Sequence, residues 1–183
     1  MSLRLASPFQ DHAVLQRDQM LPVWGWAPPG ARVRATLDGR SAVGLGNEAG
    51  EFLLRLPTFA AGGPHVLVVE VVETGERVEI RDLLIGEVWL ASGQSNMNWT
   101  LDQCRPLTDA DIASADFPDI RFFNVARRAS LGPHREVAGR WQAATPVAAP
   151  EFSAVAFAFA RRLHRELGVP VGVLSASWGG TFI

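Results

Sequence analysis

Short strand-like runs of apolar residues, one of them alternating with polar residues, make up the first part of the chain, from about Leu5 to Asp82. Val33, Ala35 and Leu37 alternate with charged or hydroxylated residues, which is the pattern of a half-buried strand. Similar strand-like runs, separated by turns rich in glycine and proline, cover residues 52–56, 66–72 and 77–80. No helical period is visible here, so the pattern predicts a small all-β domain, a sandwich or a barrel, over residues 1–82.

The pattern changes after Asp82, where the apolar runs become nearly continuous. Residues 85–91 are apolar at almost every position, as expected of a strand buried on both faces of a parallel sheet. Two further strands are predicted over residues 119–125 and 171–176, with a helix between them over residues 152–167. This order predicts a doubly wound α/β domain over residues 83–183 that is cut off early. The expected fold class is therefore α/β, with a β-sandwich-like domain in front.

The predicted helix has clear end signals. Its apolar positions follow helical spacing from Phe152 to Leu167, and basic residues occupy its polar side and last turns. Gly168 fits a C-cap, and Pro170 prevents the helix from continuing.

Composition narrows the classes of function. The formal net charge of −2 gives no basic face for phosphate, so nucleic acid is not expected as a partner. Uncharged apolar runs are only strand-sized, so no membrane-spanning helix is expected. The one cysteine, Cys104, excludes an internal disulfide and is interpreted as an incidental thiol. No secretory signal is visible. Removal of a signal ahead of Met1 would account for this, so the compartment stays open between a bacterial-type cytoplasm and the periplasm or exterior.

Two strand ends in the second part carry chemistry-bearing residues. Gln94 and Ser95 follow Gly93 directly after the buried strand, and Gly179 and Gly180 follow the strand over residues 171–176. Ligands bind beyond the carboxyl ends of parallel strands, so both segments are expected to line one site. The glycine before Ser95 permits a sharp bend that exposes its hydroxyl, and backbone N–H groups nearby would favour a developing oxyanion.

Other interpretations of these residues stay open on spacing alone. Ser95 is also a suitable helix N-cap, which is the usual role of a serine in front of a helix. Met97 stands where a G-x-S-x-G elbow would have its last glycine, so the motif is weak by itself. The pair Gly179 and Gly180 also suits a plain turn or a phosphate cradle, although no lysine-containing glycine-rich fingerprint accompanies it.

Several segments, taken together and in their order along the chain, are more specific for a protein family than any one of them alone. They are Pro8–Arg17, Val23–Ala27, Gly86–Met97, Phe152–Ala156, Gly168–Gly172 and Ser177–Thr181. They resemble, in this order, the N-terminal β-domain, the nucleophile block, the central helix with its following turn, and the second glycine block of sialate O-acetylesterase-like proteins, a branch of the SGNH hydrolases. The resemblance implies a flavodoxin-like parallel sheet after residue 82 and an enzyme that transfers an acetyl group to water.

The resemblance also implies roles for individual residues. Ser95 would be the nucleophile and would supply one oxyanion N–H, with Gly179 or Gly180 supplying another and Gln94 shaping the site. Family members complete this site with a later asparagine donor and a C-terminal Asp-x-x-His pair, whose histidine is the base. The expected substrate is an O-acetylated carbohydrate, with acetylated sialic acids and acetylated xylan or other glycans left open, and no cofactor is expected.

The chain departs from the family pattern because it has no Asp-x-x-His pair. Its histidines, for which structural or surface roles are favoured, are His12, His65, His134 and His164. No cluster of histidine, cysteine and acidic residues has metal-ligand spacing, so no metal site is expected. The leading hypothesis is therefore the N-terminal part of a carbohydrate acetylesterase, inactive alone, whose site is completed by a missing C-terminal segment.

Two other functions remain as alternatives. Trp24 and Trp26 face the same way in one predicted strand, and core packing of this pair is favoured over sugar stacking. If they do stack on sugars, the chain is a non-catalytic carbohydrate-binding or interaction protein that uses its β-domain. A nucleotide-binding module using Gly179 and Gly180 is the weakest alternative.

Overall fold

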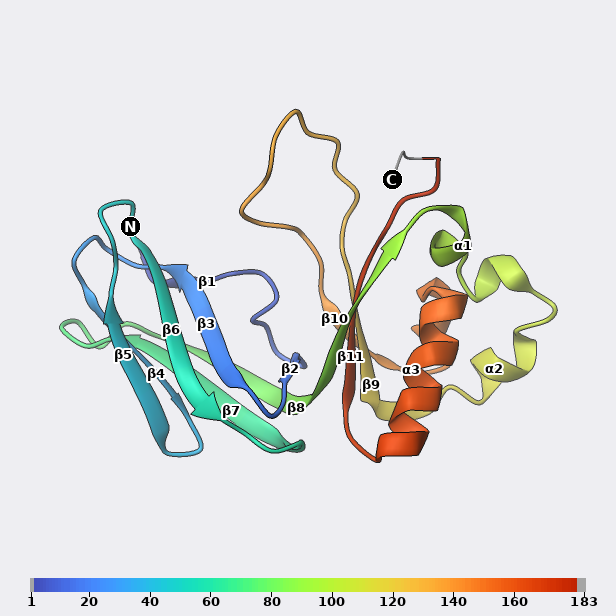
Figure 1. The fold of residues 1–183 in the computed structure, drawn as a ribbon, viewed down its shortest axis with the longest axis horizontal. Coiled ribbons are helices and arrows are strands. Elements are labelled where there is room, and N and C mark those ends of the chain that lie inside the picture. Colours follow the sequence, from blue (N-terminus) through green and yellow to red (C-terminus); the bar gives the residue numbers. More distant parts are fainter. Residues whose placement is uncertain (1, 181–183) are drawn as a thin grey trace.

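The computed structural model describes residues 2–180, and Figure 1 shows its arrangement. The first part is built of strands β1 (Arg4–Leu5), β2 (Val14–Gln16), β3 (Met20–Trp26), β4 (Arg32–Leu37), β5 (Arg40–Leu45), β6 (Glu51–Thr58), β7 (Gly62–Val71) and β8 (Arg77–Gly93). The second part adds α1 (Ser95–Asn98), α2 (Asp109–Ala113), β9 (Phe117–Asn124), β10 (Trp141–Ala144), α3 (Ala154–Leu167) and β11 (Val171–Ser177), with single 3-10 turns at Asp102–Cys104 and Ala149–Glu151. The described part of the molecule is thus mixed α/β, mostly strands with few helices, which confirms the α/β class, while the sandwich-like and flavodoxin-like domains stay predictions.

The strands of residues 2–180 form two sheets. A three-stranded sheet has the order β1-β3-β6, and an eight-stranded mixed sheet includes the path β10-β9-β11-β8-β7-β4-β5 with β2 paired to β8. The predicted alternation in β4 is confirmed, because Val33, Ala35 and Leu37 are fully buried. They belong to one apolar core with residues of β3, β6 and β7, so the β-rich part encloses its core between the two sheets.

In the second part, β8, β11 and β9 lie side by side and run parallel, whereas β10 pairs antiparallel with β9. Helix α3 covers one face of this sheet, where Phe122 and Val173 join a second apolar core. The opposite face carries Phe123 and Trp141, which pack with Val14 from the β-rich part. Strand β10 was not predicted, because its short run Trp141–Ala144 has neither an alternating nor a continuous apolar pattern.

The C-terminal end of α3 agrees with the predicted signal at Gly168, whereas the N-cap was not predicted. Ser153 is the N-cap and its side chain accepts a hydrogen bond from the Ala156 N–H, so the helix begins two residues later than Phe152. Gly168 ends the helix in the left-handed conformation, with φ of 64°, as expected of a C-cap glycine.

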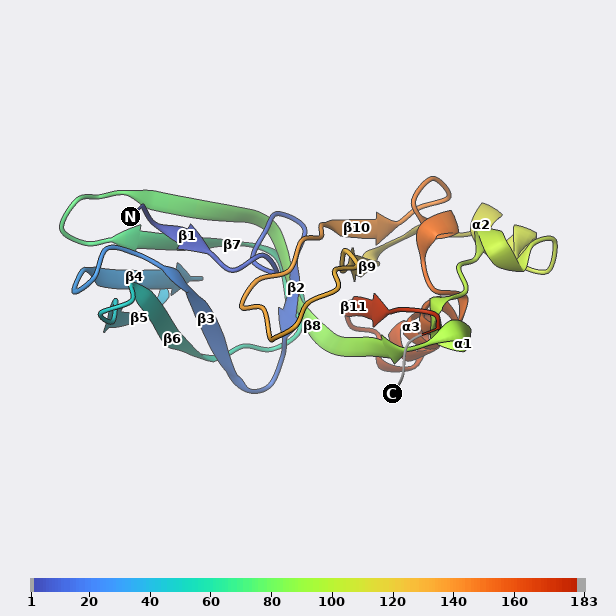
Figure 2. The same ribbon diagram turned by 90° about the horizontal axis from the view of Figure 1, so that it is seen from above.

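Strand β8 runs through both parts of the molecule, as Figure 2 shows. The predicted boundary between residues 82 and 83 lies inside it, at an irregularity where Asp82 has a φ of 51°. The pairs His65–Leu83 and Leu67–Ile80 leave one extra residue on β8 at this point, which is the geometry of a β-bulge. The division into domains 1–82 and 83–183 stays a prediction, since one strand serves both sides of the boundary.

Candidate active site

Ser95 lies on a tight turn at the carboxyl end of β8. Gly93 has a φ of 137°, a conformation that L side chains rarely adopt, and this permits the bend in front of Ser95. Gln94 is the N-cap of α1 and Ser95 is the first helical residue, so the alternative that Ser95 caps the helix is wrong. The Ser95 side chain is exposed, and its Oγ has no hydrogen-bond partner among residues 2–180.

The short helix α1 is held in place from two sides. The Ser153 hydroxyl donates to Met97 Sδ at 3.4 Å, and the Ser177 hydroxyl donates to the Met97 carbonyl, also at 3.4 Å. Just after α1, the Trp99 carbonyl accepts a hydrogen bond from the Ala154 N–H at 2.9 Å. The start of α3 and the end of β11 therefore fix the turn that carries Ser95.

The glycine block lies directly beside this turn. Ser177 pairs with Gly93 across β8 and β11, and the Trp178 N–H donates to the Gly93 carbonyl at 3.0 Å. A Cβ placed on Gly179 would lie 3.9 Å from Ser95 Oγ and 3.6 Å from Asn98 Nδ2. The structure thus brings Ser95 and Gly179 together, although 84 positions separate them in the sequence.

Gly180 is the next residue and has a φ of 80°, a left-handed conformation that suits glycine. A Cβ placed on it would meet no atom within 4 Å, so its neighbourhood is open. Thr181, which completes the same predicted segment, lies outside the described residues.

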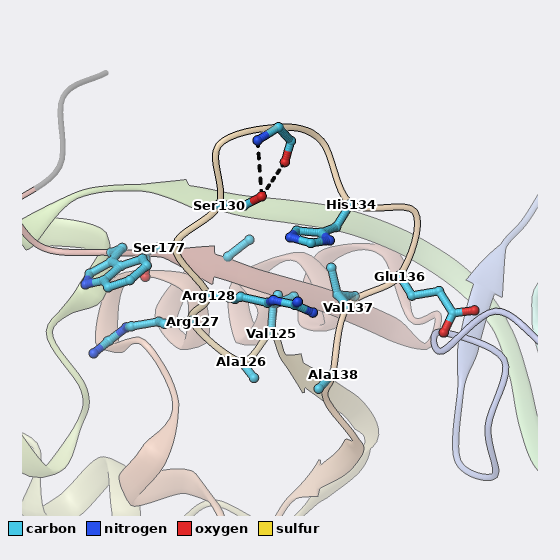
Figure 3. A pocket seen from close by; sticks show the side chains of 13 residues that line it. Val125, Ala126, Arg127, Arg128, Ser130, His134, Glu136, Val137, Ala138 and Ser177 are labelled. Atoms are coloured by element: carbon cyan, nitrogen blue, oxygen red, sulfur yellow. Dashed lines mark hydrogen bonds between the residues drawn. The ribbon is translucent and has the colours of Figure 1, made fainter.

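Hollows lined by described residues lie around the carboxyl ends of β8, β9 and β11, and three of them border the turn or the glycine block. The first, of about 350 Å³, is lined by residues 93–97, including Gln94, and by Val155. The second, of about 360 Å³, lies on the other side of α1 and is mostly polar, with Asn98, Asn124 and Ser177 in its wall. The third, of about 580 Å³, lies between Trp178 and the loop after β9 (Figure 3).

Two residues at this site were not predicted from sequence. Asn98 accepts a hydrogen bond from Arg127 Nη2 and lies close to Gly179. Asn98 is three positions after Ser95, so a one-turn helix after the glycine was a signal that could have found it. Arg127 had no such signal, because it lies in an irregular loop 29 positions away.

The histidines of the described chain have no hydrogen bond to Ser95. Nδ1 of His12 lies 2.6 Å from Asp82 Oδ2, and Nδ1 of His65 lies 2.7 Å from Asp38 Oδ2. Nδ1 of His164 lies 2.7 Å from the Val169 carbonyl, whereas His134 lines the hollow beside Trp178. Within residues 2–180 we find no group of three histidine, cysteine or acidic side chains suited to a metal ion.

The two tryptophans of β3 have different environments. Trp26 is buried beneath the Arg4 guanidinium, which lies 3.7 Å from the ring centroid. Trp24 is 38% exposed and packs edge-to-face against Phe9, and it lines an open groove of about 540 Å³. One member of the pair is thus a core residue, and the other is accessible.

No described helix is long and apolar enough to cross a membrane.

Comparison with known proteins defines the class first. No protein-family model matches the chain. A crystal structure described as a novel carbohydrate acetylesterase from Xanthomonas citri superposes with a TM-score of 0.92 and 42% identity, covering 98% of this chain and 41% of that one. The chain is therefore related in fold and sequence to a carbohydrate esterase.

The curated relatives identify the family. Sialate O-acetylesterase from Mus musculus is 32% identical over 98% of this chain, and the Homo sapiens protein of the same name is 29% identical over 97%. The chain belongs to the sialate O-acetylesterase-like family, as its sequence segments predicted. It spans 36% of the mouse protein and 37% of the human one, so little more than a third of each relative is represented.

Proposed function

We propose that this chain forms part of a serine esterase that removes O-acetyl groups from carbohydrate, with Ser95 as its nucleophile. The observation that carries the proposal is the Ser95 hydroxyl, which has no hydrogen-bond partner in the described part of the chain and lies on a tight turn beside Gly179 at the carboxyl ends of two parallel strands. The relatives support the substrate class, since they are named as a carbohydrate acetylesterase and as sialate O-acetylesterases.

In this proposal, Ser95 Oγ attacks the carbonyl carbon of the acetyl ester while a base takes its proton. The carbon–oxygen bond to the sugar then breaks, the sugar oxygen takes that proton, and an acetyl group remains on Ser95. Water repeats the attack and releases acetate. The backbone N–H groups of Ser95 and of Gly179 or Gly180 would stabilise the oxyanion, and each such donor lowers the barrier by about 3–4 kcal/mol.

The base is proposed to come from residues outside this chain, because no described histidine contacts Ser95. The exposure of the second half of β8 supports a further segment that would pack beside this strand. Over residues 87–93 its only described partner strand is β11, and Trp89 and Leu90 are 46% and 65% exposed. A further segment beside β8 would cover these side chains and close the site, so the chain by itself is expected to be inactive.

The test of this function is a serine substitution in the longer protein that contains this chain. Ser95→Ala should lower kcat on p-nitrophenyl acetate and on an O-acetylated glycan by about 10,000-fold or more, because no other group can form the acetyl-enzyme. Ser92→Ala is the matched control, since Ser92 is exposed at the same strand end and its hydroxyl donates to the Ala176 carbonyl. Undiminished turnover of Ser95→Ala would remove the assignment. Release of acetate from sialate esters but not from acetylated xylan, or the reverse, decides the substrate.

A second candidate function is glycan binding by the β-rich part without catalysis. The observation in its favour is Trp24, whose ring is exposed in an open groove. Calorimetry with acetylated and deacetylated oligosaccharides should then detect binding to the chain that Trp24→Ala abolishes. This function would be excluded if the chain gives no binding heat, or if the chain and its Trp24→Ala variant give equal heats.

A further inference from the structure

The loop between β9 and β10 is the longest irregular segment near the site. We call residues 125–140 the bridging loop, because it rises between the two parts of the molecule in Figure 1. Its base is closed by the Ala126 N–H, which donates to the Ala138 carbonyl at 2.8 Å, and the Val125 N–H donates to the Ser175 carbonyl of β11 at 2.9 Å. The loop is therefore tied at its base to the strand that leads to the glycine block.

The inner side of the bridging loop forms one wall of the hollow of about 580 Å³ beside Trp178. Figure 3 shows Arg128 and His134 inside the arch of the loop, whereas Glu136 points outward. Ser177 and Trp178 form the opposite wall and lead directly to Gly179. The position of the loop thus sets the width of a hollow that borders the Ser95 site.

The outer side of the bridging loop is held by the β-rich part. Arg135 pairs with Glu51, and the next residue, Glu136, pairs with Arg4. Gln10 Nε2 donates to the Gly139 carbonyl at 3.0 Å, close to the end of the loop.

The two partners of the loop lie in one row across the three-stranded sheet. Arg4 of β1 is opposite Trp26 of β3, and Trp26 is opposite Glu51 of β6. The Arg4 guanidinium stacks on the Trp26 ring, which restricts its position. Two consecutive loop residues of opposite charge therefore meet two fixed charges of opposite sign, about two strand spacings, or roughly 10 Å, apart.

We propose that this row of Arg4, Trp26 and Glu51 is a positioning device for the active site: it holds the bridging loop, and the loop shapes the glycan-binding hollow beside Ser95. The part of the proposal that concerns glycan rests on the proposed function, whereas the part that concerns loop position does not. Exposed ion pairs contribute only about 0.2–1 kcal/mol each, so the device acts on the loop rather than on global stability.

The experiment exchanges the two loop charges in the double variant Arg135→Glu/Glu136→Arg. This keeps the composition and net charge of the loop but puts like charges opposite both Glu51 and Arg4. Amide hydrogen exchange of Val125 and Ala126, whose N–H groups are hydrogen-bonded at the base of the loop, should become about fivefold faster, because the loop opens more often. The matched control, Arg32→Glu, opposes Glu73 in a similarly exposed pair that does not involve the loop, and it should leave exchange there unchanged.

A kinetic comparison in the longer protein separates positioning from general damage. The double variant should raise KM for an acetylated oligosaccharide about tenfold, while kcat for p-nitrophenyl acetate, which is too small to reach the loop, stays within twofold. In the variant Glu51→Arg/Arg135→Glu, the two charges of one ion pair are exchanged, so an attraction is restored. This variant should recover at least half of the amide protection that the Arg135→Glu variant loses.

Unchanged exchange in the double variant would overturn the proposal, and so would a failure of Glu51→Arg to restore protection. An absence of esterase activity in every form, with the exchange result intact, would instead overturn the proposed function and leave the positioning role standing.

Discussion

Strand β8 makes two kinds of pairing, and the contrast between them separates the two regions of the molecule. Over residues 77–85 it pairs antiparallel with β7, its neighbour in the sequence. Over residues 87–93 it pairs parallel with β11, whose partner residues lie 84 positions away. The first pairing builds the enclosed core of the β-rich part, and the second assembles Ser95 with Gly179. The candidate site thus depends on a pairing that closes a long stretch of chain and is costly in chain entropy, whereas the β7–β8 pairing closes only a short hairpin.

The largest expected effect on stability tests whether the second part of the molecule, which contains α3 and β11, unfolds separately from the β-rich part. Phe152 is fully buried and stacks on Phe122 with ring centroids 4.2 Å apart, and its carbonyl accepts a hydrogen bond from the Leu101 N–H. Phe152→Ala should lower the free energy of unfolding by about 3–5 kcal/mol, because a large cavity remains in the core. Urea denaturation measures this loss.

Amide hydrogen exchange on the same Phe152→Ala protein tests whether the two regions on either side of β8 lose stability independently. Amides of α1 and β11 should lose protection, while those of the β7–β8 hairpin keep theirs. Leu37→Ala, a fully buried substitution in the β-rich part, is the control and should have the reverse pattern. Equal loss in both regions would show that the two pairings of β8 form one cooperative unit.

The same division explains what could be predicted from the sequence. The alternation around Val33, the C-cap of α3 at Gly168 and the glycine turn before Ser95 are local patterns, and the structure contains each of them. Strand β10, the Arg127–Asn98 hydrogen bond and the bridging-loop ion pairs were not predicted. Each of these joins residues far apart in the chain, and no periodicity in a single segment records such a contact. The roles of Ser95, Gln94, Gly179 and Gly180 stay predictions.

A medium loss of stability is expected when one methyl group is added at a position where two strands approach closely. A Cβ on Gly86 would lie 2.1 Å from the Pro170 carbonyl oxygen, at the point where β11 begins to pair with β8. Gly86→Ala must therefore displace backbone, and we expect a loss of about 2–3 kcal/mol in the free energy of unfolding. In the longer protein it should also lower esterase activity, because the shift of β11 moves Gly179 away from Ser95.

Gly25→Ala is the matched substitution in the β-rich part. A Cβ there would lie 2.2 Å from the Arg4 carbonyl oxygen, but it displaces only the two-residue strand β1. We expect a loss of about 1 kcal/mol, the lower end of the usual cost of overpacking, and retained p-nitrophenyl acetate hydrolysis. Thermal melts and kinetics of both variants check this; equal loss of activity would contradict the separation of the regions.

The smallest expected effect lies at Asp82, where the two pairings of β8 meet. Its carboxylate lies 2.6 Å from His12 Nδ1 and accepts a hydrogen bond from the buried Arg121, at 3.0 Å from Nη2. Burial raises the pKa of Asp82, but the hydrogen bonds from His12 and Arg121 together outweigh it and hold that pKa below its ordinary value. The carboxylate is 40% exposed, so solvent screening keeps its contribution to about 1 kcal/mol.

The sign of the pH dependence follows from this lowered pKa. The charged Asp82 stabilises the fold above the unfolded-state pKa of about 3.9, and this contribution disappears as the pH falls through the lower folded-state value. Asp82→Asn keeps a residue that tolerates the left-handed backbone and, like the protonated form of Asp82, has no charge, one acceptor oxygen and one donor group. Unfolding free energies of both proteins should differ at pH 7 and converge below pH ~4, whereas Asp119→Asn, an exposed control on β9, should show no such difference. A difference that persists at low pH would mean that Asp82 joins the two regions through its shape rather than through its charge.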